Sequence, residues 1–304
     1  LKALSNEARR VRPKHFRDAG LAPASLDALM LDTKTTFDQL IYRYARDETT
    51  AQRIVKNRFY QAISGALSGT HEYMAMEKLY ELSASGSYEL IVIDTPPTRN
   101  ALDFLEAPKR LTSFLEGRLL KWFLLPALGG GRGLFRAMNL AAVTFLKIVT
   151  RVVGAEVLKD TAEFFANFEG MYEGFKERAQ AVYQLLRTDT TRFVIVTAPS
   201  DEAVAEALFF ASKMRSYRLP FGGLVVNRVH PRFDGSGVRS SPARMVGRLI
   251  TLAGDFDQVR RREERSLERL QDQIPEDLWV RIPYLSGEVV DLSGLKEVGR
   301  HLFT

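Results

Sequence analysis

The run from Tyr88 to Thr98 constrains the fold of this chain more than any other stretch. Leu90 to Ile93 form a short apolar run that ends at Asp94, and two prolines and Thr98 follow directly. A continuous apolar strand is typical of a parallel sheet that is covered on both faces. Proline cannot continue such a strand, and threonine is a favourable N-cap of a helix. We therefore predict a buried strand over residues 88–94, a turn, and a helix after Thr98.

Strands and helices alternate before and after a long helical stretch. Besides residues 88–94, strands are predicted over 193–197, 222–227 and 278–282. Helices are predicted from about Thr33 onward and over 50–67, 72–84, 201–216, 243–273 and 292–302. The pattern indicates an α/β protein with a doubly wound, mostly parallel sheet and a large all-helical insertion. We expect the α/β core over residues 1–104 and 191–304, and the insertion over 105–190.

Composition excludes several classes of site. The chain has 45% hydrophobic and 26% charged residues, as ordinary globular proteins do. It has no cysteine, which excludes disulfides, thiolate zinc sites and thiolate capture of metalloids. Its basic N-terminal stretch lacks interleaved aromatic residues, which favours a solvated face over a nucleic-acid site. No apolar run reaches the length of a membrane span and no signal peptide is visible, so we expect a cytoplasmic protein, at most peripheral at a membrane.

Asp94 is the first candidate for chemistry. The strand prediction places it at the carboxyl edge of a sheet, where open α/β folds bind their ligands. In P-loop nucleotidases an aspartate at this position holds the magnesium shell or the attacking water. The alternative is that Asp94 only caps a turn.

Four segments, in the same order along the chain, resemble the ArsA/Get family of anion-transporting ATPases. Residues 94–105 (Asp-Thr-Pro-Pro-Thr-Arg-Asn-Ala-Leu-Asp-Phe-Leu) resemble its switch II motif, and residues 68–72 are similar to its Pro-Gly-Ile-Asp-Glu stretch. Residues 223–231 resemble the asparagine motif on the adenine side, and residues 281–289 resemble the late loop over the base. The similarity spans nearly the whole chain.

The resemblance implies a dimeric motor that uses ATP and Mg²⁺ and whose helical insertion handles a cargo. It implies a homo- or heterodimer with a related subunit, with an apolar helix or a membrane protein as the cargo or partner. The residues that it singles out are Asp94 for catalysis and, indirectly, for Mg²⁺; Thr95, Asn227, Arg228 and Pro283 for the nucleotide; and Glu72 and Thr98 for the switch. The residues alone leave plainer roles open: Asn227 can cap a turn, Pro283 can end a strand, and Glu72 can be a first-turn helix carboxylate.

The sequence also departs from the family pattern. No Gly-x-x-x-x-Gly-Lys-Ser/Thr motif occurs in the 304 residues, and the similarity begins just after the family's first βαβ unit. We therefore expect a fragment without its phosphate loop, which folds poorly and binds ATP negligibly by itself. The lack of cysteine removes the metalloid thiolates and the Cys-x-x-Cys zinc clasp of family members. Pro96, Arg99 and Asn100 replace the commoner Ala, Gly and His.

Residues 119–149 are the most apolar region of the chain. They could form a groove that receives an apolar helix or membrane segment, or they could be a subdomain core or dimer interface. Two other functions stay open. The chain could be a non-catalytic partner subunit of such an ATPase, or a ParA/MinD-type partitioning ATPase, against which the long helical insertion counts.

Overall fold

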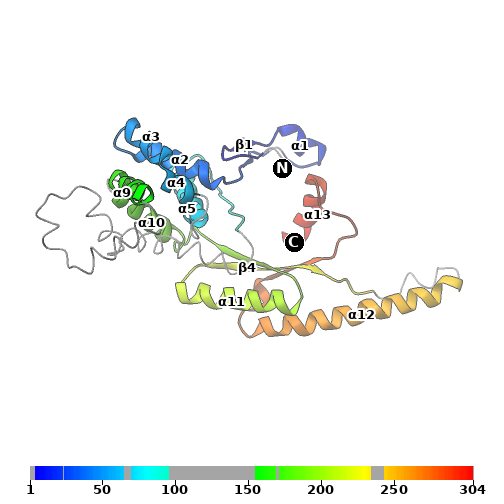
Figure 1. The fold of residues 1–304 in the computed structure, drawn as a ribbon. Helices are drawn as coiled ribbons and strands as arrows, with labels where there is room; N and C mark the ends of the chain where they lie inside the picture. The colour runs from blue at the N-terminus through cyan, green and yellow to red at the C-terminus, as the bar shows by residue number, and fades with distance from the viewer. Residues whose placement is uncertain are drawn as a thin grey trace, which may run out of the picture. The chain divides into compact units, whose positions relative to one another are not determined.

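The computed structural model describes residues 4–22, 24–64, 70–95, 155–168, 171–233 and 243–303 (Figure 1). Contacts divide the chain into two compact units. The helical unit comprises Leu1–Arg9 and Ala28–Gln184, and the sheet unit comprises Arg10–Asp27 and Leu185–Thr304. The helix expected after Thr98 and the apolar region 119–149 lie outside the described residues, as does much of the insertion expected over 105–190.

The helical unit is built from short helices around an aromatic core. Its helices are α2 (Thr33–Tyr44), α3 (Glu48–Lys56), α4 (Arg58–Ile63), α5 (Thr70–Ala84), α9 (Ala155–Phe168) and α10 (Tyr172–Leu185). Asn57 separates α3 from α4 because its extended backbone ends the first helix while its side chain caps the second, accepting from the Tyr60 N–H. Phe164, Phe168 and Phe175 stack in series with ring centroids 5.3 and 5.1 Å apart. These three rings lie in the hydrophobic core of the unit.

The sheet unit contains three parallel strands in the order β3-β4-β5. These are β3 (Phe193–Thr197), β4 (Phe221–Val229) and β5 (Trp279–Pro283). The helices are α1 (Pro13–Asp18), α11 (Asp201–Tyr217), α12 (Ala243–Gln271) and α13 (Leu292–Leu302), with a short 3₁₀ turn η4 (Glu276–Leu278) before β5. The two-residue strands β1 (Arg9–Arg10) and β2 (Asp27–Ala28) pair with each other. Parallel strands joined through helices confirm the α/β class.

The two faces of this sheet differ in how they are covered. Ile195, Leu224 and Val226 are buried, and α11 packs against both β3 and α12. On β3 the alternate residues Val194 and Val196 are exposed, while α13 contacts β5. Among the described helices, none has the length and hydropathy needed to cross a bilayer.

The predicted buried strand over residues 88–94 is wrong in this structure. The segment is irregular, and Leu90 and Val92 are 78% and 82% exposed. A strand needs a neighbour that completes its hydrogen-bond ladder. The strands described in the main sheet pair only with one another, so this segment has no ladder partner among the described residues. The apolar run therefore has the composition of a buried strand but no neighbouring strand among the described residues.

Candidate functional site

The carboxyl edge of the parallel sheet is the first candidate site. Because the three strands run in the same direction, their C-terminal ends meet at one edge, where α/β folds bind ligands. Val226 pairs with Arg281 and Val229 pairs with Pro283, so β4 has one residue more than β5 between these two pairs. Asn227 and Arg228 form this bulge. Bulges are common next to functional sites because they re-aim side chains.

The bulge brings three of the predicted nucleotide residues together. Asn227 and Arg228 lie at the end of β4, beside the end of β5 that carries Pro283. Asn227 is half-buried and Arg228 is exposed. Arg228 has a φ of 62°, a left-handed conformation that costs energy for a residue other than glycine. Such backbone persists where the surroundings fix it, and it is frequent at ligand sites.

The side chains of His230 and Glu263 connect this edge of the sheet to α12. The His230 N–H donates to Glu263 Oε2 at 3.0 Å, and its ring Nδ1 lies 2.6 Å from Oε1. The imidazole stacks on Tyr284 with centroids 5.4 Å apart, and the Tyr284 N–H donates to the Val229 carbonyl at 2.8 Å. These contacts fix the ends of β4 and β5 to each other and to α12.

The sequence did not predict a role for His230, Glu263 or Tyr284. His230 lies inside the predicted asparagine motif and Tyr284 directly follows Pro283, so the neighbouring motifs gave a signal for both. Glu263 lies in a helix of mixed charges, where nothing in the sequence distinguishes it from the glutamates around it.

The N-terminus of α11 also lies after the end of β3, but it does not favour an anion. Its first turn contains Asp201 and Glu202, whose carboxylates already complement the positive end of the helix dipole. Asp201 accepts a hydrogen bond from Ser266 at 2.8 Å. A phosphate at this helix start would meet two negative charges.

The catalytic and switch candidates lie in the helical unit. Asp94 and Thr95 are exposed at the end of the irregular segment that follows α5. Glu72 is in the first turn of α5, and its Oε2 is buried with no hydrogen-bond partner among the described residues. Thr98 lies outside the described residues. The helical unit therefore contains Asp94, Thr95 and Glu72, and the sheet unit contains Asn227, Arg228 and Pro283.

A buried ion pair holds α5 against α10 a little beyond Glu72. Arg178 Nε lies 2.9 Å from Glu77 Oε2, and both side chains are buried. Tyr73 also hydrogen-bonds to Glu77, and the Arg178 guanidinium lies 3.8 Å from the ring centroid of Tyr44. Desolvation raises the pKa of Glu77 above its ordinary value, against the lowering effects of Tyr73 and Arg178. Desolvation also raises the pKa of Tyr73 well above its ordinary value, so this hydroxyl stays protonated.

The described residues suit part of a magnesium-nucleotide complex. They contain no group of three His, Asp or Glu side chains placed to bind a metal by themselves. In nucleotidases, however, Mg²⁺ needs only one or two carboxylates besides the phosphates, and the exposed carboxylate of Asp94 can serve as one. The amide of Asn227 suits a nucleobase. The sequence contains no phosphate-loop motif, so these residues do not account for binding of the phosphates.

Comparison with known proteins gives a consistent family. The chain matches the family model described as anion-transporting ATPase over residues 24–304. It is 22% identical to the ATPase get3 of Sclerotinia sclerotiorum over 281 residues, which cover 92% of this chain and 72% of that protein. It is 23% identical to the ATPase GET3 of Podospora anserina over 266 residues, or 87% of this chain and 68% of that protein.

A plant relative matches over a shorter stretch. The ATPase GET3B of Arabidopsis thaliana is 29% identical over 167 residues, which cover 54% of this chain. The matched residues are only 35% of the plant protein.

Proposed function

The chain belongs to the anion-transporting ATPase family, and on this premise we propose that it binds ATP with Mg²⁺ and couples ATP hydrolysis to movement of a helical subdomain that binds a partner or cargo. The family supports nucleotide hydrolysis as the chemistry.

The bulge at the end of β4 is the observation that carries this proposal. It groups Asn227 and Arg228 with Pro283 at the carboxyl edge of the sheet. A carboxamide can both donate to and accept from an adenine edge, as asparagine does with adenine in DNA. Pro283 offers an apolar ring beside it. The hydrogen bonds of His230 to Glu263 hold this edge in one conformation, which reduces the entropy lost on binding.

Asp94 is proposed to act at the phosphate end of the nucleotide. Bound Mg²⁺ neutralises charge that builds up on the phosphates during transfer. The Asp94 carboxylate would order the water shell of the ion or orient the attacking water, and the neighbouring Thr95 hydroxyl would donate a hydrogen bond to the nucleotide. No covalent intermediate is needed, because phosphoryl transfer of this kind depends on positioning and electrostatics.

Movement is proposed to pass from the Asp94 segment to the helices through α5. The segment leads directly out of α5, which carries Glu72 in its first turn and Glu77 in its interior. The buried Glu77–Arg178 pair connects α5 with α10. In this proposal, a shift of the Asp94 segment moves α5 and, through this ion pair, α10. In this proposal the protein works in the cytoplasm as a homo- or heterodimer, with an apolar helix or a membrane protein as cargo.

The rate of ATP hydrolysis by the full-length protein tests the role of Asp94. Asp94→Asn keeps the size of the side chain and removes its charge. We expect turnover to fall roughly 100-fold or more, the loss typical of one positioned electrostatic contact, while ATP still binds. Asp189→Asn, at another exposed aspartate, serves as the control. Undiminished turnover in Asp94→Asn would exclude the proposed role, and a protein that binds no ATP would favour the non-catalytic partner subunit.

Nucleotide preference tests the role of Asn227. We expect Asn227→Ala to weaken ATP binding by about 1–3 kcal/mol and to reduce the preference for ATP over GTP, because the amide reads the base edge. The measurement is competition of ATP and GTP against a fluorescent ATP analogue. Equal weakening for both nucleotides would mean that Asn227 supports the fold and does not read the base.

A further inference from the structure

A local excess of positive charge surrounds α1, and the proposed function gives it no role. Residues 9–28 contain five lysines or arginines and two aspartates, a charge of +3 and thus half of the formal +6 of the chain. Asp27 already pairs with Arg10, with Oδ1 and Nε 2.8 Å apart. The remaining cations of this stretch in the sheet unit are Arg12, Lys14 and Arg17.

These three cations lie on the solvent side of the element. All three are exposed, and none of them forms an ion pair with another residue that the structure describes. Lys14 and Arg17 are three residues apart, so they lie on the same side of the helix, with the exposed Asp18 next to them. Phe16 and Ala19 are buried and form the inner side of α1.

Contacts with α13 hold α1 in place. The Lys296 ammonium of α13 donates to the Gly20 carbonyl at 3.0 Å, just past the C-terminal end of α1 (Figure 1). Gly20 has a φ of 63°, the left-handed conformation with which many helices end, and the Leu21 N–H donates to the Phe16 carbonyl at 2.8 Å. The cations of α1 are therefore carried by a fixed backbone, which reduces the entropy lost on binding.

Exposed aliphatic side chains flank the cations. The Val11 N–H donates to the Leu26 carbonyl at 2.8 Å, so Leu26 lies beside Arg12, and its side chain is 46% exposed. Leu295, which directly precedes Lys296, is 54% exposed. Cations beside exposed aliphatic side chains are typical of surfaces that lie on membranes, because the cations attract acidic lipids while the apolar groups enter the boundary of the acyl chains.

A nucleic acid fits these residues less well than a lipid surface. Binding of single strands depends on exposed rings on which the bases stack. The only phenylalanine, tyrosine or tryptophan of residues 10–27 is Phe16, and it is buried. A nucleic acid would also leave Leu26 in water, whereas a bilayer can take up this side chain.

We propose that Arg12, Lys14, Arg17 and Leu26, which we call the basic surface, dock the protein on a bilayer that contains acidic lipids. The three cations lie beside the lipid phosphates and Leu26 enters the boundary of the acyl chains. Each lysine or arginine near such a bilayer raises the membrane-bound fraction about fivefold, so the three together contribute about 100-fold. This docking goes beyond the proposed function and needs no nucleotide, so its test is independent of ATP hydrolysis.

Cosedimentation of the full-length protein with vesicles, in the absence of nucleotide, tests the docking. The vesicles consist of phosphatidylcholine alone or of phosphatidylcholine with about a third of phosphatidylglycerol, which supplies the negative surface potential. We expect binding to the mixed vesicles that weakens as salt is added, because salt screens exposed charges. Equal binding to both kinds of vesicle, or binding to neither, would overturn the proposal.

A triple variant tests whether the basic surface is the part that binds. Arg12→Gln, Lys14→Gln and Arg17→Gln together are expected to weaken binding to the mixed vesicles about 100-fold. Lys14→Gln alone, with an expected loss of about fivefold, keeps the test valid if the triple variant fails to fold.

The matched control makes the same change of charge in the helical unit. Its three positions are also two arginines and one lysine, all exposed and without an ion pair to any described residue: Arg46→Gln, Arg53→Gln and Lys56→Gln. This control should retain most of the binding. Equal losses in the two triple variants would mean that net charge alone governs binding, which would contradict a docking surface at α1.

The apolar contribution is tested separately. Leu26→Ser is expected to weaken the binding that remains at high salt, while Leu252→Ser, at a residue of α12 that is 51% exposed, should not. Equal effects of the two serine variants would count against insertion of Leu26. Binding of an oligonucleotide through the same cations, with no binding to either kind of vesicle, would identify a nucleic acid as the partner and overturn the proposal.

Discussion

The residues that tie α5 to α10 are charged, and yet they lie in the interior of the helical unit. Burying an ion pair removes water from both charges, and the mutual attraction offsets this cost only when the geometry is good. Here the Glu77 carboxylate receives hydrogen bonds from both Arg178 and Tyr73, so its oxygens are satisfied. Arg178 is less complete, because its Nη2 is buried without a hydrogen-bond partner among the described residues. The pair therefore specifies how the helices meet more than it stabilises them.

The raised pKa of Glu77 gives a signed prediction for Glu77→Gln. A carboxyl whose pKa is higher in the folded protein than in the unfolded chain contributes stability below its ordinary pKa. That contribution is lost as pH rises through the raised value. Glutamine cannot ionise, so the unfolding free energy of Glu77→Gln should improve relative to the parent protein as pH rises from 4 to 7.

Urea unfolding followed by circular dichroism at several pH values measures this difference. Glu173→Gln, at an exposed residue of α10, controls for loss of a surface carboxylate. A difference that is constant with pH, or that moves in the opposite direction, would contradict the idea that burial governs Glu77.

At the scale of the elements, periodicity predicted the helices and strands of the sheet unit closely. The strand over 193–197 and the helix over 292–302 have the bounds that the sequence indicated. Each has a local signal, such as the Asp291 cap of α13, that does not depend on distant residues. The segment over 88–94 differs because its strand character depends on a neighbour that the apolar pattern does not reveal. For the same reason the sequence predicted roles for Asn227 and Pro283 but not the bulge between their strands, since register is a property of the pair of strands.

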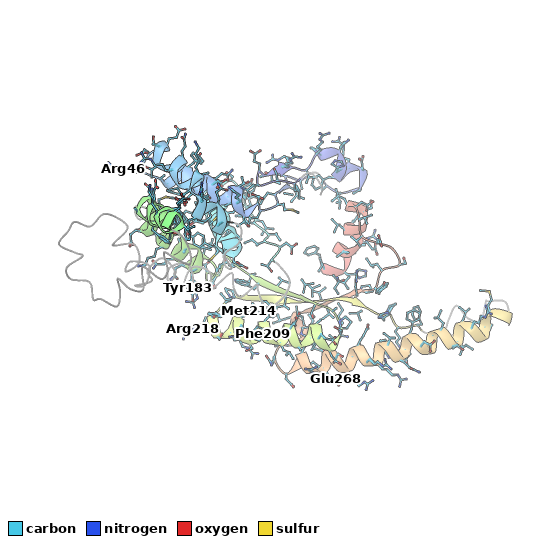
Figure 2. All side chains as sticks on the ribbon, in the orientation of Figure 1. Arg46, Tyr183, Phe209, Met214, Arg218 and Glu268 are labelled. Atoms are coloured by element: carbon cyan, nitrogen blue, oxygen red, sulfur yellow. The ribbon has the colours of Figure 1, made fainter. Side chains whose placement is uncertain are left out.

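The C-terminal end of α11 offers a test of backbone strain. Arg218, which is labelled in Figure 2, has a φ of 55°. Its backbone N–H donates to the carbonyls of Arg215 and Met214. Glycine is favoured at such a left-handed position after a helix. The Arg218 side chain is exposed, so its removal costs little packing. We expect Arg218→Gly to raise the unfolding free energy by about 0.5–1 kcal/mol.

Chemical denaturation of Arg218→Gly and of the parent protein measures this change in unfolding free energy. Ala205→Gly, at an exposed position inside α11, is the matched control and should lower the unfolding free energy by about 1 kcal/mol. If both glycine variants are destabilised alike, the left-handed backbone at Arg218 is not a source of strain.

At the scale of the whole molecule, β3 forms the edge of the described sheet and presents apolar side chains. Val194 and Val196 are 55% and 66% exposed on this strand. An edge strand with exposed apolar residues tends to pair with other chains. The exposed Leu90, Val92 and Ile93 add a second apolar stretch in the helical unit. We therefore expect the 304-residue chain to associate into species of no fixed mass.

Replacing Val194 and Val196 by threonine tests whether β3 drives this association. Threonine keeps the β-branched shape that suits a strand and adds a hydroxyl, so the sheet should persist while its exposed face becomes more polar. Light scattering of the chain at rising concentration should then show less growth in average mass. Val290→Thr makes the same substitution at a residue that is 81% exposed and lies outside the sheet, and it should leave the growth unchanged. The result separates association by the strand edge from a general effect of apolar surface, because only a contact along β3 depends on which valines are replaced.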